Sequence, residues 1–256
     1  MPDRTPAPPP DSDGVGLPPA LDLLAVGPHR DDVELLCGGT LCNAVDRGRR
    51  VGIVDLTQGE AGTRGSAALR AAEAEAAARV LGVAVRENLE LPDAGIENTP
   101  ETRARLVGVL RRLRPVVVIA PSPQGRHPDH RVASELVRDA CFLAGIAKFA
   151  PGLPAHRPRK VMYAVAYRED APKPTFVVDV SATFERKLAA VRCYGSQFDG
   201  ATQAGEVLPT GEPLYDVVRH QAAHYGSLVR ARYGEPFVTV ETLRVEDVTA
   251  LDVSTF

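Results

Sequence analysis

The sequence lacks the features that mark several large classes of protein. Only four of its 256 residues are cysteines and none stands in a C-x-x-C pair, which excludes a zinc knuckle and a disulfide framework. It has no run of about twenty apolar residues, so no membrane span is expected. The formal net charge of −3 provides no basic surface field, so a nucleic-acid partner is not expected either.

Common nucleotide-binding and hydrolase signatures are also missing. The sequence contains no P-loop and no G-x-S-x-G elbow, and the G-V-G at residues 14–16 precedes any predicted strand. Residues 1–20 are rich in proline and aspartate, and we expect a disordered tail that is neither a signal peptide nor a transit peptide. Without a disulfide pattern, the expected compartment is the cytoplasm.

What the sequence does contain is a regular alternation of short apolar runs and helical segments. Strands are predicted at residues 21–26, 51–56, 88–91 and 115–120, and helices at residues 35–46, 67–81, 101–113 and 131–147. Further strands are predicted at residues 161–167, 175–180 and 237–240, with helices at residues 184–194 and 216–233. The alternation predicts an α/β fold, a Rossmann-like and mostly parallel sheet with helices on both faces, in a single domain over residues 21–256.

Two polar motifs follow two of the predicted strands, H-R-D-D at residues 29–32 and H-P-D-H at residues 127–130. Because open α/β sheets bind ligands beyond the carboxyl ends of their strands, the two motifs can meet in space. Two imidazoles and a carboxylate with an open position describe a catalytic metal site, and a spare carboxylate can activate water. Each motif alone could be a turn that caps a helix, but together they favour a metal-dependent hydrolase.

These motifs resemble those of a known family. H-R-D-D-V-E at residues 29–34 with G-G-T at residues 38–40 is similar to the H-P-D-D-x-E…G-G-T signature of the LmbE/PIG-L deacetylases, whose H-P-D-H motif is matched at residues 127–130. Four further stretches look like the subgroup that deacetylates N-acetylglucosaminyl malate in bacillithiol synthesis: residues 55–60, 88–93, 194–198 and 233–237. The resemblance covers residues 21–240.

The resemblance implies a metal site and its ligands. His29, Asp32 and His130 would bind the metal. That metal would be Zn²⁺, although two histidines and a carboxylate also suit Fe²⁺. The resemblance also implies a homo-oligomer, a hexamer.

It further implies catalytic roles for three residues. Asp31 would be the general base that takes a proton from water. His127, oriented by Asp129, would stabilise the oxyanion or protonate the departing amine. Arg30 stands where the family usually has proline, whose ring fixes the backbone φ. An arginine there could loosen the loop, add a cation at the rim of the site, or point into solvent.

Arg64, Asp93 and Tyr194 resemble positions at which the family holds its sugar. An arginine suits a carboxylate such as malate, and an aspartate suits sugar hydroxyls. The alternatives are ordinary loop polarity for the first two residues and core packing for Tyr194. Glu34 could brace a metal ligand or simply lie in the first turn of a helix, where an acid is favoured.

His220 and His224 form a second histidine pair, four residues apart on one predicted helix face as in H-E-x-x-H metalloproteases. Gln221 stands where those enzymes have a general-base glutamate, and a glutamine cannot accept a proton. We therefore expect a surface or interface pair, with a second metal site as the alternative.

The leading hypothesis is a zinc-dependent amidohydrolase that removes the acetyl group from an N-acetylglucosamine-type sugar, N-acetylglucosaminyl malate first. One alternative is the same chemistry on another acylated amino sugar: a mycothiol precursor, a chitooligosaccharide or an antibiotic intermediate. Another is a non-catalytic sugar- or metal-binding protein on the same fold.

Overall fold

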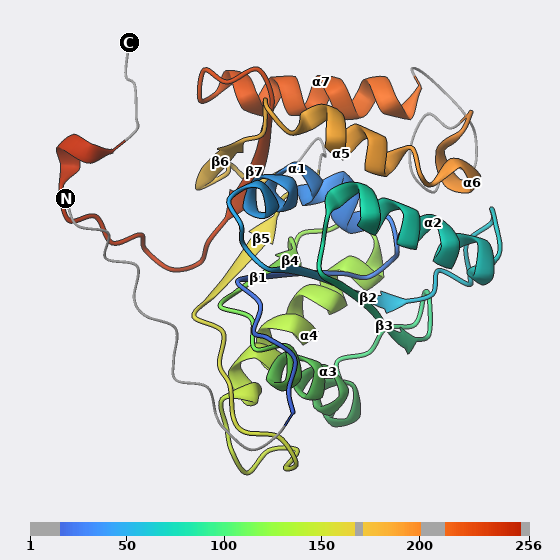
Figure 1. The fold of residues 1–256 in the computed structure, drawn as a ribbon, viewed down its shortest axis with the longest axis vertical. Coiled ribbons are helices and arrows are strands. Elements are labelled where there is room, and N and C mark those ends of the chain that lie inside the picture. Colours follow the sequence, from blue (N-terminus) through green and yellow to red (C-terminus); the bar gives the residue numbers. More distant parts are fainter. Residues whose placement is uncertain (1–15, 167–170, 201–212, 252–256) are drawn as a thin grey trace.

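The computed structural model describes residues 16–166, 171–200 and 213–251, and within them a seven-stranded sheet runs in the order β3-β2-β1-β4-β5-β7-β6 (Figure 1). The strands are β1 (Leu23–Gly27), β2 (Val51–Thr57), β3 (Val85–Leu91), β4 (Val117–Pro121), β5 (Lys160–Ala164), β6 (Phe176–Asp179) and β7 (Gly234–Val238). The strands from β3 to β5 in this order are parallel, and β7 pairs antiparallel with both β5 and β6. The predicted α/β class and mostly parallel sheet are confirmed.

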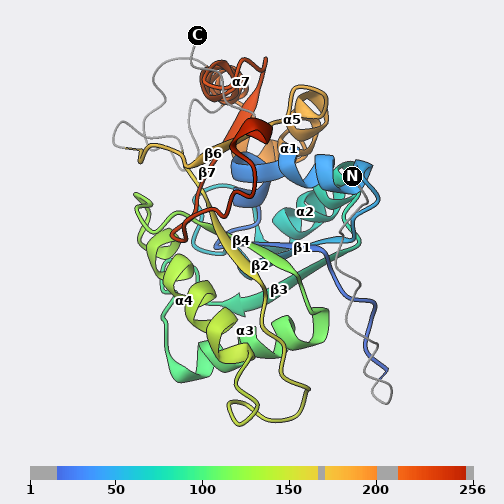
Figure 2. The same cartoon turned by 90° about the vertical axis from the view of Figure 1, so that its left-hand side faces the viewer.

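Helices cover both faces of the sheet (Figure 2). They are α1 (Asp32–Asp46), α2 (Ala67–Leu81), α3 (Pro100–Leu113), α4 (Pro128–Ala144), α5 (Phe184–Val191), the short α6 (Gly195–Phe198) and α7 (Leu214–Ser227), with a 3-10 turn η1 (Val248–Ala250). α3 and α4 pack on one face, and α1, α2, α5 and α7 lie on the other. None of the described helices is long and apolar enough to cross a membrane.

Strand β1 shows why the sheet can be covered on both sides. Its five residues are all buried, and successive side chains of a strand point to opposite faces. Leu23 and Ala25 belong to the apolar cluster under α1 and α2, whereas Leu24 and Val26 belong to the cluster under α3 and α4. A continuous apolar run therefore marks a strand at the centre of the sheet.

Polar and glycine residues set the ends of the helices between these strands. The hydroxyl of Ser66 accepts a hydrogen bond from the N–H of Leu69 at the start of α2, which ends at Gly82 with φ of 78°. Thr99 and Thr102 form a capping box at the start of α3. These local signals explain why both helices begin and end close to their predicted bounds.

The strand order reverses at β1, which pairs with β2 on one side and with β4 on the other. The loop after β1 and the loop after β4 therefore open at the same place on the carboxyl edge of the sheet. This is the switch point at which open α/β sheets bind ligands. It explains how residues about a hundred positions apart in sequence become neighbours.

Helix α1 is interrupted at Cys37, whose backbone is not helical (φ −145°, ψ 17°). Two charged side chains complete the broken hydrogen-bond ladder. Nζ of Lys187 donates to the carbonyl oxygen of Leu35 at 2.8 Å, and the carboxylate of Glu235 accepts from the N–H groups of residues 39 and 40 at 2.9 and 2.7 Å. The two side chains also pair with each other at 2.6 Å. Each half of α1 thus has its own cap.

Several predicted bounds differ from the structure. The helix predicted at residues 216–233 ends at Ser227, because the chain turns back so closely that a Cβ on Gly226 would lie 2.8 Å from the backbone of Tyr233. The helix predicted at 184–194 ends at Val191. The last strand begins at residue 234 rather than 237. Residues 1–15 lie outside the described residues, as does residue 167 of a predicted strand, so the disordered tail stays a prediction.

Candidate metal centre

The two polar motifs lie side by side at the switch point. The ring centroid of His29 is 5.0 Å from that of His127 and 5.6 Å from that of His130. His29 lies in the loop between β1 and α1, whereas His127 is the N-cap of α4 and His130 lies in its first turn. The structure therefore brings the two loops together, as the metal-site hypothesis requires.

Asp32 joins the two candidate histidine ligands. Its Oδ2 lies 3.0 Å from Nδ1 of His29, and its Oδ1 lies 3.1 Å from Nε2 of His130. Donor atoms around a tetrahedral ion at roughly 2.0–2.2 Å are about 3.3–3.6 Å apart, close to this spacing. Burial alone would raise the pKa of Asp32, but His130 and His29 hold it well below its usual range. The donor set and its spacing fit a divalent metal, and the three residues are candidate ligands.

The other ring nitrogen of His29 faces two further carboxylates. Its Nε2 lies 3.0 Å from Oδ1 of Asp93 and 3.4 Å from Oδ2 of Asp129. Burial lowers the pKa of His29, but hydrogen bonds with Asp129, Asp32 and Asp93 raise it to about 12. A carboxylate behind a metal-binding imidazole fixes the orientation of the ring. The carboxylates also favour a cation among them, which can be a metal ion or a proton.

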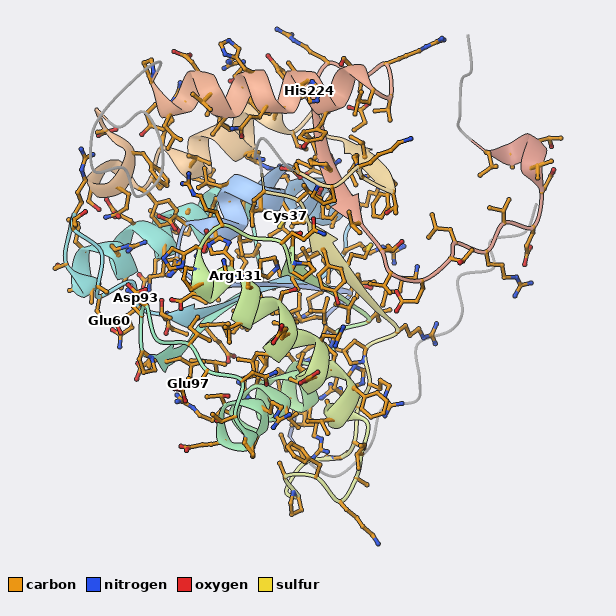
Figure 3. The ribbon with its side chains drawn as sticks, turned by 180° about the vertical axis from the view of Figure 1, so that it is seen from behind. Cys37, Glu60, Asp93, Glu97, Arg131 and His224 are labelled. Carbon is orange, nitrogen blue, oxygen red and sulfur yellow. The ribbon has the colours of Figure 1, made fainter. Side chains whose placement is uncertain are left out.

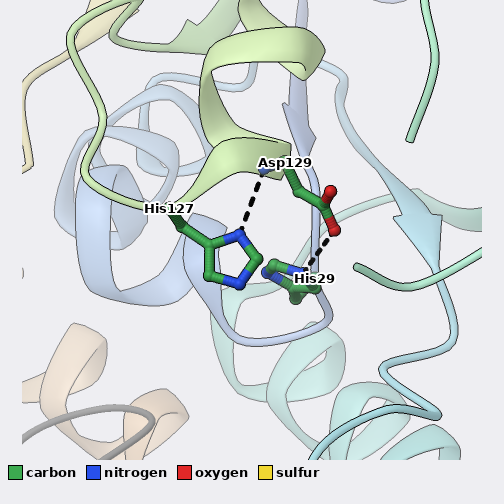
Figure 4. A group of neighbouring side chains, drawn as sticks. All are labelled: His29, His127 and Asp129. Carbon is green, nitrogen blue, oxygen red and sulfur yellow. Dashed lines mark hydrogen bonds and ion pairs between the residues drawn. The ribbon is translucent and has the colours of Figure 1, made fainter. Parts of the chain in front are cut away.

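His29, His127 and Asp129 form a second group with donor atoms close together (Figure 4). Its carboxylate is already engaged, because Asp129 accepts hydrogen bonds from the N–H groups of Ala94 at 2.8 Å and Ile96 at 3.3 Å. Nδ1 of His127 accepts one from the N–H of Asp129 at 3.2 Å. Within the described part of the chain, Asp32 accepts only one such bond, from the N–H of His29 to Oδ2 at 2.9 Å, whereas both oxygens of Asp129 accept one, so the group with Asp32 and His130 is favoured as the metal centre.

The same contacts change the part expected of Asp129. It orients His127 through its backbone N–H and not through its carboxylate (Figure 4). Since Nδ1 of His127 is an acceptor, the neutral ring carries its proton on Nε2. Burial, together with the neighbouring His29 and His130, lowers the pKa of His127. A neutral His127 can donate a hydrogen bond from Nε2 but is a poor acid.

Asp31 is the spare carboxylate beside the candidate ligands. It is buried, with only 8% of its surface exposed, yet it borders the cavity at the metal centre. Burial and the neighbouring Asp32 raise its pKa, while Arg70 lowers it in part. Nη2 of Arg70 lies 3.1 Å from Oδ2 of Asp31, and its Nη1 donates to the carbonyl oxygen of Gly59. A carboxylate with a raised pKa is suited to accept a proton from water.

A buried guanidinium lies behind the loop that carries these residues. Arg86 donates to both carboxylate oxygens of Asp55 at 2.8 Å, to Oε1 of Glu34 at 2.6 Å and to the carbonyl oxygen of Arg30 at 2.6 Å. Burial raises the pKa of Glu34 to about 7, with Asp55 adding to the rise and Arg86 opposing it. Arg86 therefore connects strand β3 to the middle of the loop between β1 and α1, which carries His29 and Asp31 and is called the metal loop below.

The structure corrects the expectations for Arg30. Its side chain is buried, at 9% exposure, and Nη1 donates to the carbonyl oxygen of Ala67 at the start of α2 at 2.6 Å. It is neither a rim cation nor a solvent-facing arginine. Because its own carbonyl is held by Arg86, the loop is anchored from both sides of this residue. The loop is therefore fixed without the family's proline.

Two of the residues expected to hold a sugar lie away from the centre. Tyr194 is fully buried in the core, where its hydroxyl donates to Glu34 at 3.0 Å, so its placement is that of the packing alternative. Arg64 turns toward the carbonyl oxygens of Gln197 and Asp199 at 3.3 and 3.4 Å and does not line the cavity. Asp93 does line it, beside His29. Its sugar contact stays a prediction.

His220 and His224 are both exposed on α7, as expected. Neither belongs to a candidate metal group among the residues that the structure describes. Sequence reasoning missed Arg70 and Arg86. The only signal for Arg70 was a lone arginine in the first turns of an alanine-rich helix. Arg86 gave no signal, since it is one of several charged residues in the strand V-R-E-N-L-E-L.

On a mostly parallel α/β sheet, a candidate site of two histidines and a carboxylate beside a buried carboxylate is the arrangement expected of a metal-dependent hydrolase. The sequence profile of a family described as GlcNAc-PI de-N-acetylase (PIG-L) matches residues 24–141. The diacetylchitobiose deacetylase of Thermococcus kodakarensis is 33% identical to this chain, over an alignment that covers 83% of this chain and 80% of the relative. The chain thus belongs to the PIG-L/LmbE family of deacetylases.

Two further relatives differ in what they act on. A 1D-myo-inositol 2-acetamido-2-deoxy-alpha-D-glucopyranoside deacetylase of Mycobacterium sp. (strain KMS) is 30% identical over 70% of this chain and 75% of its own. A 4-oxalmesaconate hydratase of Pseudomonas putida is 27% identical over the same shares, 70% and 75%. The family resemblance in the chain therefore extends to proteins with different substrates.

Solved structures agree with the fold. A conserved protein of Thermus thermophilus superposes with a TM-score of 0.80 at 39% identity, covering 88% of this chain and 98% of its own. The N,N'-diacetylchitobiose deacetylase of Pyrococcus horikoshii, in complex with its inhibitor MPG, gives a TM-score of 0.73 at 31% identity, covering 84% and 82%.

Proposed function

We propose that this protein is a zinc-dependent hydrolase that removes the acetyl group from an N-acetylglucosamine-type sugar. The observation that carries the proposal is the placement of Asp31 beside the candidate ligands His29, Asp32 and His130. Zinc fits because hydrolysis needs no redox chemistry and two imidazoles with one carboxylate suit it. The relatives that act on acetylated sugars support the substrate class.

When a metal is bound at these residues, it lowers the pKa of a coordinated water and makes hydroxide available near neutral pH. The protein residues supply the proton transfers. Asp31 accepts a proton from the water that attacks the acetamide carbon. His127 donates a hydrogen bond from Nε2 to the carbonyl oxygen, where negative charge develops.

The carbon–nitrogen bond then breaks, and the departing nitrogen needs a proton to leave as an amine. Asp31 holds the proton it took from water and can return it. His127 is less suited to this step, because its Nδ1 accepts the Asp129 N–H and its lowered pKa keeps it neutral. Acetate and the free amino sugar are the products.

The test is a purified-protein assay that measures acetate and amine together. The substrates are diacetylchitobiose, N-acetylglucosamine, its inositol glycoside and N-acetylglucosaminyl malate, before and after a chelator and after zinc or ferrous iron is restored. Equal release of acetate and amine that is lost with the chelator supports the proposal. Metal bound without hydrolysis of any acetylated sugar would instead indicate a binding protein.

The malate aglycone, the homo-oligomer and the choice of zinc over iron remain predictions. The hydratase relative supplies a competing class, addition of water to a carbon–carbon double bond. It would be favoured if 4-oxalmesaconate were consumed while no sugar released acetate.

A further inference from the structure

The cavity at the metal centre continues well beyond it, under helix α7. Its volume is about 920 Å³. This is near the upper end of the roughly 300–1,000 Å³ typical of small-molecule pockets, so it has room for more than one sugar ring. Figure 3 shows α7, marked by His224, lying above α1, marked by Cys37. The apolar side chains of this lining that are here called the apolar arm are Leu35, Leu36, Val165, Val217, Ala222 and Tyr225, with Gln221 of α7 among them.

Three side chains of the apolar arm line the cavity and lie outside the two large apolar clusters. Val165 and Tyr225 are only 4% and 7% exposed, and Val217 is half-buried. None of the three belongs to either apolar cluster among the described residues. Val218 and Ala222, on the same helix as Val217 and Tyr225, belong to a core cluster and also line the cavity. The described part of α7 thus presents apolar side chains to the cavity as well as to the core.

The charged residues along the described part of this cavity are mutually compensated, except at the metal end. Lys187 and Glu235 pair at 2.6 Å and are only 3% and 1% exposed, and both also bind the backbone of α1. Arg70 pairs with Asp31. Arg126 is exposed and lies next to His127, at the metal end. An ionised carboxylate in the apolar arm would be desolvated without a partner, which is costly.

We propose that the apolar arm binds an uncharged, apolar aglycone, an alkyl or aryl group carried by the amino sugar. The inference rests on the proposed function, because the acetamide must lie at the metal centre for the rest of the molecule to reach the arm. Such an aglycone is opposite in polarity to the dianionic malate. Removing the aglycone from water supplies the binding free energy.

The experiment compares three glycosides of N-acetylglucosamine, with methyl, hexyl and malyl aglycones. The hexyl glycoside is expected to have a kcat/KM at least about tenfold above that of the methyl glycoside. The malyl glycoside is expected to be no better than the methyl one. Val217→Gln, which makes the arm polar, should lower the hexyl-to-methyl ratio at least about threefold.

Leu228→Gln is the matched control, since Leu228 ends the same helix, is 56% exposed and does not line the cavity. It should leave the hexyl-to-methyl ratio as in the wild type. Methyl and hexyl glycosides with equal kcat/KM, or a malyl glycoside better than the hexyl one, would overturn the inference.

A binding measurement separates this inference from the proposed function. Hexyl and methyl glucosides lack the acetamide and cannot be deacetylated, so calorimetry reports only how the cavity takes the aglycone. If no acetylated glycoside is hydrolysed, the proposed function fails. The inference about the apolar arm is then still tested by two comparisons. Hexyl glucoside should bind more tightly than methyl glucoside, and Val217→Gln should remove that difference.

Discussion

Arg86 donates a hydrogen bond of 2.6 Å to the carbonyl oxygen of Arg30. Arg30 stands between the candidate ligand His29 and the proposed base Asp31, so the contact reaches the centre of the metal loop from a different strand. The guanidinium also holds Asp55, and it is buried at 9% side-chain exposure. A planar group with five donors can make all of these bonds at once, including two to Asp55, whereas an ammonium group has only three donors.

Arg86→Lys is therefore expected to loosen the loop while keeping the charge. The affinity for zinc should fall about 10- to 100-fold, the range seen when a group that orients a ligand is lost. Competition with a chromophoric chelator measures it. Arg112→Lys is the control, since Arg112 pairs with Glu87 at a more exposed site, 38% and 24% by side chain, and should change the affinity little. Unchanged zinc affinity in Arg86→Lys would remove this role.

Asp31→Asn tests the general base. An amide cannot accept the proton of water, so kcat should fall by about 10²–10⁴. Zinc content, measured by atomic emission on the purified variant, should remain near the wild-type value, because Asp31 is not among the candidate ligands. Wild-type-like turnover would falsify the assignment.

His130→Ala tests the metal site itself. Removing one of two imidazoles leaves Asp32 and His29 without their third donor, so zinc should be lost on dialysis together with activity. His224→Ala is the matched histidine control, exposed on α7 and outside both candidate groups. Loss of zinc in His224→Ala but not in His130→Ala would mean that the site lies on α7.

Arg70→Gln should change the pH dependence of the reaction. Arg70 lowers the pKa of Asp31, so its removal lets the pKa rise further. The base acts only when ionised, and the acid limb of kcat/KM should therefore move to higher pH, with activity lost first on the acidic side. A pH profile of the variant against the wild type measures this. A limb that stays in place, or moves to lower pH, contradicts the Arg70–Asp31 coupling.

The sheet could be predicted because strands β1 and β4 are unbroken apolar runs followed by turns, and β2 is interrupted only at Asp55. The meeting of the candidate metal ligands could be predicted because each motif is short and follows a strand at the switch point. Arg70 and Arg86 could not, since their partners lie 39 and 56 residues away and pairing over such distances depends on how α2 and β3 pack. Tyr194 was expected near the sugar by resemblance, but it is buried and its hydroxyl donates a hydrogen bond to Glu34.

The break in α1 ties the metal loop to the far end of the chain. A fragment limited to residues 24–141, the part matched by the family profile, would contain every candidate ligand. It would lack Lys187 and Glu235, and the carbonyl of Leu35 and the amides of residues 39 and 40 would lose their partners. Such a fragment should hold α1 poorly beyond Asp32, so we expect that helix to become fully ordered only when the last third of the polypeptide has docked.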